Sequence, residues 1–172
     1  GTAVFPAACT LVAAMNPCPC GYLGHTEKAC RCSGAAVERY RARVSGPLLD
    51  RIDALIEVPP LTLAALERTV EGETSALVRD RVSAAREFRR HRENRQDDQA
   101  RVPLEEKNGL TTEARGLLRD VLVRDGLSGR AYVRTVRLAR TIADLDGVWP
   151  ARMDHVAEAL ALRLDQRRVG LF

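Results

Sequence analysis

With 172 residues, a formal net charge of +4 and an isoelectric point near 9.0, the chain can form one domain or two small ones around a real apolar core. No apolar run approaches the length that a bilayer crossing requires, and no signal-peptide pattern opens the chain, which argues against membrane and secreted classes and predicts a cytoplasmic protein. Five cysteines in such a compartment favour metal binding or chemistry over disulfides.

The first part of the chain leads a short apolar run into a polar loop. Residues 9–15 predict a parallel strand covered on both faces, although a buried helix segment has the same pattern. Cys9 lies in this run and is interpreted as a core side chain. Asn16 ends the run, and residues 16–33 form a loop rich in Pro and Gly, which is not helical. Because the chain opens with Gly-Thr rather than Met, we expect a fragment.

Four cysteines fall in two pairs within this loop: Cys18 with Cys20, and Cys30 with Cys32. Four thiolates can bind one tetrahedral zinc ion, and a loop with little core of its own would gain its order from that metal. The gap of one residue within each pair is shorter than the usual two to four. Unliganded thiols or a disulfide are the alternatives, and the ligand count favours zinc. His25 is interpreted as a solvated loop residue.

A helix, a second strand and a boundary follow the loop. Ser33 is predicted to be the N-cap of a helix that ends before Gly46-Pro47. Residues 54–58 then predict a strand, closed by Pro59-Pro60. This double proline predicts the domain boundary, with 1–60 on one side and 61–172 on the other.

Beyond the boundary, the apolar residues repeat with a helical period between start and stop signals. Four helices are predicted, capped by Thr74 or Ser75, by Thr111 or Thr112 and by Ser128, with the last opened by Pro150. The predicted inner face of the first helix consists of Leu77, Val78, Val82, Ala85 and Phe88. The predicted fold class is therefore an α/β fragment followed by a helical bundle.

Several polar residues are candidates for a site, and each also has an ordinary explanation. Asn16 can hold a water near a phosphate, or simply form an Asn-Pro turn. Arg51 lies among apolar neighbours, where it either pairs with Asp50 or Asp53 or projects into a site on another subunit. Arg130 begins a helix, and a solvated basic face is the simpler interpretation.

The helix predicted over 78–95 is rich in arginine and could contact nucleic-acid phosphates. By itself the pattern favours a solvated helix face, because no aromatic residue except Phe88 is interleaved with the arginines. The sequence contains no Gly-x-x-x-x-Gly-Lys-Ser/Thr motif, and no apolar run ends in Asp-Glu. Without the Walker motifs that hold the phosphates and magnesium, the chain is not expected to hydrolyse a nucleotide unaided.

Three separated motifs in the right order resemble the magnesium-chelatase-like AAA+ ATPases of bacteria, in the ComM/YifB branch of that family. They are LVAAMNPCPCG at 11–21, RYRARVSGPLLDRID at 39–53 and LSGRAYVRTVRLARTIADLD at 127–146. The resemblance covers nearly the whole chain, but it corresponds only to the second half of such an ATPase. It implies that 1–60 is the C-terminal part of an AAA+ core, with strands, helices and a zinc loop, and that 61–172 is a helical lid.

The resemblance also implies roles for three residues. Asn16 is similar to the sensor-1 residue, which orients the attacking water, and Arg51 to the arginine finger, which reaches the nucleotide of a neighbouring subunit. Arg130 is similar to sensor 2 on the lid; Arg43 and Arg134 are weaker alternatives for the finger and for sensor 2. These roles imply ATP and magnesium in the full-length protein and a ring, expected to be a hexamer.

DNA is the partner that the resemblance implies, in agreement with the arginine-rich helix. Two alternatives of other classes remain open. One is a zinc-stabilised helical module that binds DNA or protein without an ATPase role. The other is a chelatase-type motor subunit that acts on a protein partner.

Overall fold

The structure, a computed structural model, describes residues 3, 6, 9–25, 27–49, 51–60, 67, 72–96 and 109–168. The chain separates into two compact units, Gly1–Val44 and Ser45–Phe172. The contacts therefore join residues 45–60 to the helical part, whereas our predicted boundary assigns them to the first domain. Asp50 and residues 61–66 lie outside the described residues.

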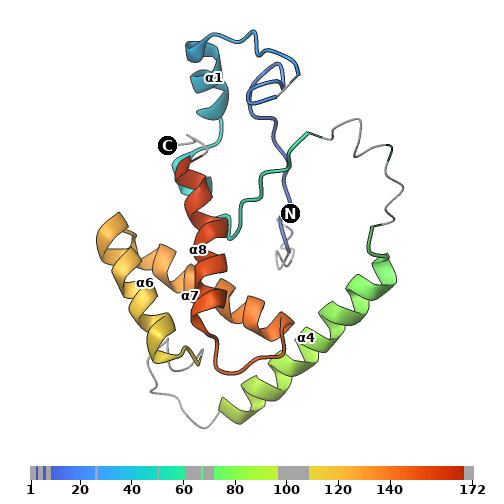
Figure 1. Cartoon of the computed structure of the whole chain (residues 1–172), viewed down its shortest axis with the longest axis vertical. Coiled ribbons are helices and arrows are strands. Elements are labelled where there is room, and N and C mark those ends of the chain that lie inside the picture. The colour runs from blue at the N-terminus through green and yellow to red at the C-terminus, as the bar shows by residue number, and fades with distance from the viewer. Residues whose placement is uncertain are drawn as a thin grey trace. The chain divides into compact units, whose positions relative to one another are not determined.

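The first unit contains the apolar run, the cysteine loop and α1 (Gly34–Arg41) (Figure 1). Ser33 is the N-cap of α1, as predicted: its Oγ accepts a hydrogen bond from the Ala36 amide at 3.3 Å. This bond satisfies one of the amides that a helix leaves unpaired in its first turn, which fixes where the loop ends.

Neither predicted strand is paired into a sheet in the part of the chain that the structure describes. The only β-pairing assigned there is an isolated parallel bridge between Leu110 and Ala151. In the run 9–15 the side chain of Val12 is 88% exposed, and Cys9 is exposed too, so the interpretation of Cys9 as a core residue is wrong. An apolar strand needs neighbours to pair its backbone and cover its faces, and no described segment does either.

The second unit begins with α2 (Gly46–Leu49), a single turn whose Leu49 is buried. The segment predicted as a strand, 54–58, follows it without regular structure. The Leu55 amide donates a hydrogen bond to the carbonyl of Leu162 at 2.9 Å, which joins the segment to the last helix.

The described residues of this unit also form four longer helices: α4 (Ser75–Gln96), α6 (Thr112–Asp125), α7 (Gly129–Leu145) and α8 (Met153–Arg168). The predicted caps are confirmed at Thr111 and Ser128, whose hydroxyls accept from Ala114 and Ala131, both at 3.2 Å. The predicted stop of α6 is confirmed by Gly126, whose φ of 58° is a left-handed conformation that glycine adopts without strain.

The last helix begins later than predicted. Proline at 150 predicts a helix start there, but α8 begins at Met153. The backbone of Ala151 instead bonds to the chain before α6: its amide donates to Gly109 at 2.6 Å and its carbonyl accepts from Thr111 at 3.0 Å. Hydrogen bonds to a distant segment thus override the local start signal.

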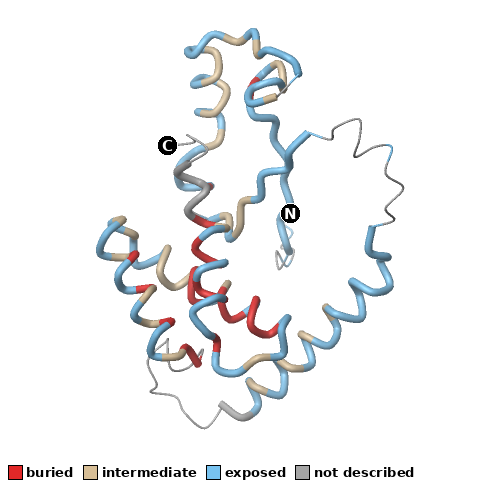
Figure 2. The backbone as a smooth tube through the Cα atoms, in the orientation of Figure 1, coloured by how far each residue is buried: buried red, intermediate tan, exposed pale blue. Residues whose placement is uncertain are grey.

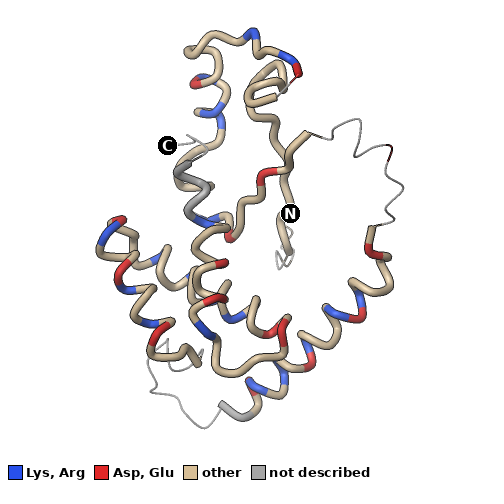
Figure 3. Tube along the Cα trace, viewed as in Figure 1, with Lys and Arg blue, Asp and Glu red and all other residues tan. Residues whose placement is uncertain are grey.

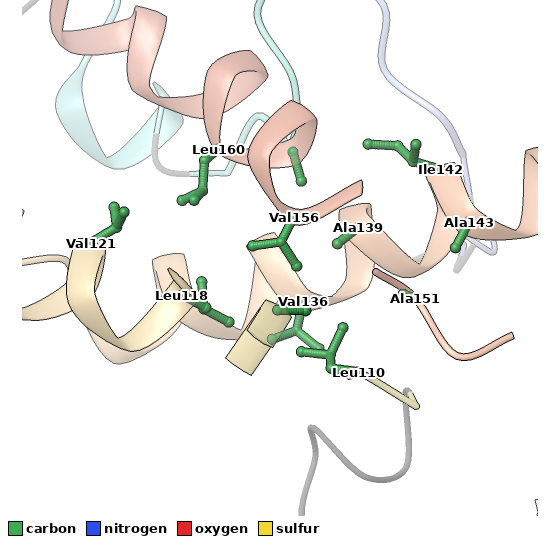
Figure 4. Packing of buried hydrophobic residues seen from close by; sticks show 12 residues of the cluster. Leu110, Leu118, Val121, Val136, Ala139, Ile142, Ala143, Ala151, Val156 and Leu160 are labelled. Carbon is green, nitrogen blue, oxygen red and sulfur yellow. The ribbon is translucent and has the colours of Figure 1, made fainter. Parts of the chain in front are cut away.

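The core lies where α6, α7 and α8 meet (Figure 4). Leu118, Val136 and Val156, one from each helix, point toward one another, and all three are buried. Small side chains let the helices approach closely: Ala139, Ala143 and Ala159 are fully buried. Figure 2 shows this buried region as the main one in the second unit.

The long helix α4 packs on α7, and much of its surface is exposed (Figure 2). We predicted an inner face that includes Leu77 and Val78, but these side chains are 60% and 37% exposed. Phe88 and Arg92, nearer the C-terminal end, make the contacts with α7 and its following loop. The predicted inner face is therefore wrong for the first turns of the helix, because α7 is reached only farther along it.

Candidate functional sites

The four paired cysteines gather into one cluster. Their Sγ atoms all lie within 4.8 Å of one another, and Cys18 is buried. Cys18 and Cys20 are 3.4 Å apart at sulfur, and each is 3.6 Å from Cys30. All five cysteines of the chain are free thiols in this structure, so the disulfide alternative is not realised.

Tight turns bring the first cysteine pair to the cluster. The Gly21 amide donates to the Cys18 carbonyl at 3.0 Å, and Gly21 has a φ of 81°, which disfavours residues with a side chain. The other pair directly precedes the Ser33 cap, so α1 holds its end of the loop. His25 accepts at Nδ1 from the amides of Glu27 and Lys28, at 3.1 and 3.2 Å, and so stabilises the loop tip. This bonding agrees with its interpretation as a loop residue.

The electrostatics of the cluster suit a cation. Amides of Tyr22 and then Arg31 donate to the Cys20 sulfur and lower its pKa to about 6. The strongest single influence on the pKa of Cys32 is a hydrogen bond from the Cys20 amide, which lowers it. The Cys20 thiol, burial and the Cys30 thiol act in the opposite direction, and the resulting pKa of Cys32 is raised to about 12. Four thiolates this close repel one another, so they cannot all ionise without a positive charge among them.

The geometry fits zinc. Four sulfurs around one Zn²⁺ at about 2.3 Å form a tetrahedron with edges of about 3.8 Å. The sulfur separations among Cys18, Cys20 and Cys30, 3.4 to 3.6 Å, need only a small expansion to reach it. A Cys₄ set leaves no ligand position open for chemistry, which indicates a structural role for the ion.

Asn16, the candidate sensor 1, is exposed in the first unit and lies directly before the cysteine loop. Its side-chain amide lies beside Gly21, where an added Cβ would be 3.9 Å from Nδ2. The order of the loop therefore bears directly on the position of this amide. Arg43, the alternative finger, is an exposed residue of the same unit.

Arg51, the candidate finger, is exposed in the second unit, and its Nη1 donates to the Pro47 carbonyl at 2.6 Å. We considered a local pair with Asp53, but that carboxylate instead binds Arg134 of α7, with 2.6 Å between Oδ1 and Nη1. The same Nη1 lies 2.5 Å from the carbonyl oxygen of Arg51. The structure thus brings Arg51 and α7 together through Arg134.

Arg130, the candidate sensor 2, is exposed in the first turn of α7, one turn before Arg134. No hydrogen bond or ion pair joins its guanidinium to any residue that the structure describes. The guanidinium of Arg134 is occupied by Asp53 and a carbonyl, which favours Arg130 over Arg134 as the residue available to a ligand.

Sequence reasoning missed the role of Arg163, which is buried on α8. Its Nη1 donates to the carbonyls of Ile52 and Asp53, at 3.4 and 3.2 Å. A signal was present: Arg163 follows Val156 and Leu160 at helical spacing on the inner face of α8. A charge in that register predicts a buried partner.

Figure 3 shows arginines along α4, and the six of them whose side chains the structure describes divide into two groups. Three are engaged by acidic side chains: Arg81 by Glu73, Arg89 by Glu93 and Arg92 by Asp144, at 2.8, 2.7 and 3.2 Å. Three exposed ones form no ion pair within the described parts of the chain; these are Arg79, Arg86 and Arg90.

Comparison with known families identifies the class of protein. The description "Magnesium chelatase, subunit ChlI" matches residues 1–66, and "Magnesium chelatase, subunit ChlI C-terminal" matches residues 72–163, more than half of the chain. The chain belongs to this magnesium chelatase subunit ChlI family, as its motifs predict. The first match ends at residue 66 and the second begins at residue 72.

Individual relatives agree with this placement. The chain is 42% identical over 167 residues to the competence protein ComM of Haemophilus influenzae, with 92% of the chain and 31% of that protein covered. It is 39% identical over 165 residues to YifB of Escherichia coli, with 95% and 32% covered. The chain thus spans about a third of the length of these relatives, less than the half that the resemblance implied. Among the described helices, none is both long and apolar enough to cross a bilayer.

Proposed function

We propose that this chain is the C-terminal portion of a ring-forming AAA+ ATPase that remodels DNA or translocates on it. The ring is a hexamer, and the preceding part of the full-length protein supplies the loop that holds the phosphates of ATP and its magnesium. This chain supplies sensor 1 (Asn16), the arginine finger (Arg51) and sensor 2 (Arg130). Family membership supports the class of protein.

The availability of the Arg51 charge carries the proposal. A finger must present an uncompensated guanidinium to the transferring phosphoryl group, because its effect on the rate is electrostatic. Asp53 is the nearest described carboxylate along the chain, and it is engaged by Arg134 at 2.6 Å. The Arg51 side chain is exposed and donates to a neutral carbonyl, so its positive charge is not cancelled there.

The other two residues are assigned complementary tasks. The Asn16 side chain can accept from the attacking water and donate to a phosphate oxygen. The exposed Arg130 at the start of α7 can bind the γ-phosphate while it is present and release the lid after hydrolysis.

The cysteine cluster holds a structural zinc ion in this proposal. Cys18, Cys20, Cys30 and Cys32 would bind it as thiolates, and the ion would supply the positive charge that the cluster needs. The loop lies immediately after Asn16, so the metal would also restrict the sensor-1 side chain.

DNA is assigned as the partner because α4 presents arginines in a row. Arg79, Ser83, Arg86 and Arg90 follow one another at spacings of four, three and four residues, so they lie on one face of the helix. A surface hollow of about 510 Å³ borders this face and is lined by Ser83, Arg86 and Arg90 together with the ion pair of Arg89 and Glu93. Exposed, unpaired guanidinium groups in a row suit the regularly spaced phosphates of a nucleic-acid strand.

Replacing Arg51 by alanine in the full-length protein tests the ATPase assignment. We expect kcat for ATP hydrolysis to fall by about 10³-fold or more, with a smaller change in KM, because a finger acts on the transition state. Steady-state ATPase kinetics measure both parameters. Arg137→Ala, which removes an exposed arginine of α7, is the control and should stay within about twofold of wild type. Unchanged turnover in Arg51→Ala would reject the finger and favour a binding module without ATPase function.

A further inference from the structure

Residues 51–55 are bound to the helical bundle although they form no regular structure. Three successive carbonyls, those of Arg51, Ile52 and Asp53, accept hydrogen bonds from arginine side chains of α7 and α8. The Leu55 amide donates to the Leu162 carbonyl at 2.9 Å. Side chains of the bundle thus supply the partners that a sheet would otherwise give to such a segment.

Arg134 makes the closest of these contacts. A single nitrogen, Nη1, lies 2.5 Å from the Arg51 carbonyl oxygen and 2.6 Å from the Asp53 carboxylate. The side chain of Arg134 is 25% exposed, whereas that of Asp53 is 68% exposed, so only the guanidinium is partly shielded from water. Hydrogen bonds from a charged guanidinium are shorter and stronger than neutral ones. The hydrogen bond from Arg134 therefore holds the backbone carbonyl of Arg51 in place.

The other side of Arg51 is held as well. The Arg51 amide donates to the Leu48 carbonyl at 2.9 Å, and its guanidinium donates to the Pro47 carbonyl at 2.6 Å. Hydrogen bonds thus hold the Arg51 backbone at both its amide and its carbonyl, while its side chain is exposed. On α7, Arg130 lies one turn before Arg134, so the contact also ties the segment of Arg51 to the helix that carries Arg130.

We propose that Arg134 is a positioning residue, which holds the Arg51 segment against α7 so that Arg51 is oriented in advance for its phosphate. This inference rests on the proposed function, because it requires Arg51 to act on ATP. Arg134 needs no contact with the nucleotide. A guanidinium misplaced by about 1 Å can lose about 100-fold in rate, so loss of an anchor at its own backbone is expected to be costly.

Steady-state ATPase kinetics of the full-length protein provide the first test. Arg134→Gln should lower kcat by about 10- to 100-fold and leave the KM for ATP within about twofold. Arg134→Lys keeps the charge and one donor, so it should recover part of the loss. Arg137→Gln, an exposed arginine on the same helix, should remain within about twofold of wild type. Normal turnover in Arg134→Gln, or an equal loss in Arg137→Gln, would overturn the proposal.

A double substitution separates positioning from a direct or merely structural role. If Arg134 acts only through Arg51, then Arg51→Ala/Arg134→Gln should be no slower than Arg51→Ala alone. A further loss of the same size would mean that Arg134 acts by itself, and the proposal would be wrong. Full activity of Arg51→Ala would instead reject the proposed function, and the positioning role with it.

Amide hydrogen exchange in the 172-residue chain tests the contact without ATP. Arg134→Gln should make the Leu55 amide exchange at least about tenfold faster, while the core amides of α7 and α8 keep their rates. An unchanged Leu55 rate would show that Arg134 does not hold the segment, whatever the kinetics. Equal acceleration throughout the bundle would indicate a general loss of stability and would also overturn the proposal.

Discussion

At the scale of single residues, a buried ion cluster joins α4 to α7. The Arg140 side chain is 3% exposed, and its Nε donates to Asp144 at 2.9 Å. Asp144 also accepts from Arg92 at 3.2 Å, and the guanidinium of Arg140 lies 4.7 Å from the centre of the Trp149 ring. Burial lowers the pKa of Arg140 from its usual value, so the Asp144 charge is what keeps the buried cation acceptable.

Removing that anion should be strongly destabilising. Asp144→Ala removes the carboxylate that both guanidinium groups contact, and we expect a loss of about 3–5 kcal/mol in the free energy of unfolding. Urea unfolding followed by circular dichroism measures this loss. The control is Glu73→Ala, which breaks the exposed pair with Arg81 and should cost about 0.5 kcal/mol or less. A loss below about 1 kcal/mol for Asp144→Ala would show that the cluster is not a determinant of stability.

A glycine beside this cluster has a conformational reason. Gly109 has a φ of 61°, and a Cβ there would collide with the ring of Trp149. Trp149 in turn stacks on Arg140, so the turn before α6 and the loop before α8 fit together only with glycine at 109. Gly109 thus permits both the turn before α6 and the packing of Trp149 on the Arg140 guanidinium.

At the scale of elements, the cysteine loop and the helical bundle are stabilised by different interactions. The bundle buries apolar side chains from three helices. Among the described residues of the loop, only Cys18 is buried. A segment without an apolar core depends on other interactions for its order, and a bound metal can supply them.

We therefore expect chelation to disorder the loop and leave the bundle folded. Elemental analysis should find about one zinc ion per chain in the wild type and clearly less in Cys18→Ser. The control is Cys9→Ser, which removes a thiol outside the cluster and should keep the metal. After chelation, amides of 16–33 should exchange faster, while the thermal unfolding of the helices is unchanged. Purified protein that is metal-free yet ordered in this loop would contradict the zinc proposal.

At the scale of the whole molecule, the net charge of +4 does not reveal where a polyanion would bind. The distribution of unpaired charge is more informative. On α4, three arginines are balanced by carboxylates, and another three, on one face, are not. If DNA is the partner, as proposed, the second group would replace counterions of the DNA with its own charge, and binding would depend on salt.

Salt dependence of DNA binding by the full-length protein tests this face. Replacing Arg79, Arg86 and Arg90 by glutamine should reduce the slope of log K against log salt by about 2–3, since each lost phosphate contact contributes about 0.7–0.9. The matched control replaces Arg115, Arg119 and Arg124 of α6, which changes the net charge equally. Equal effects of the two triple variants would indicate net charge alone, and a flat salt response would exclude contacts with phosphates.

The sequence by itself determined the family, the pairing of the cysteines in one loop and the helices of the second unit, because these depend on local signals. The caps at Ser33, Thr111 and Ser128 set where a helix begins through contacts within one turn. Apolar periodicity indicates a helix from residues within that helix alone. Thiols close in sequence need only tight turns to meet. The same locality explains the failure at Pro150, where a bond from Ala151 to a distant segment displaced the start of the helix.

Only the tertiary structure decided which charges are available. Arg51 and Asp53 are near neighbours in sequence and could pair, but Asp53 binds Arg134, which is 81 positions away. The burial of Arg140 with Asp144 likewise requires α4 and the loop that carries Trp149 to come together. Whether a charge is paired depends on what long-range packing brings beside it, and no local pattern carries that information.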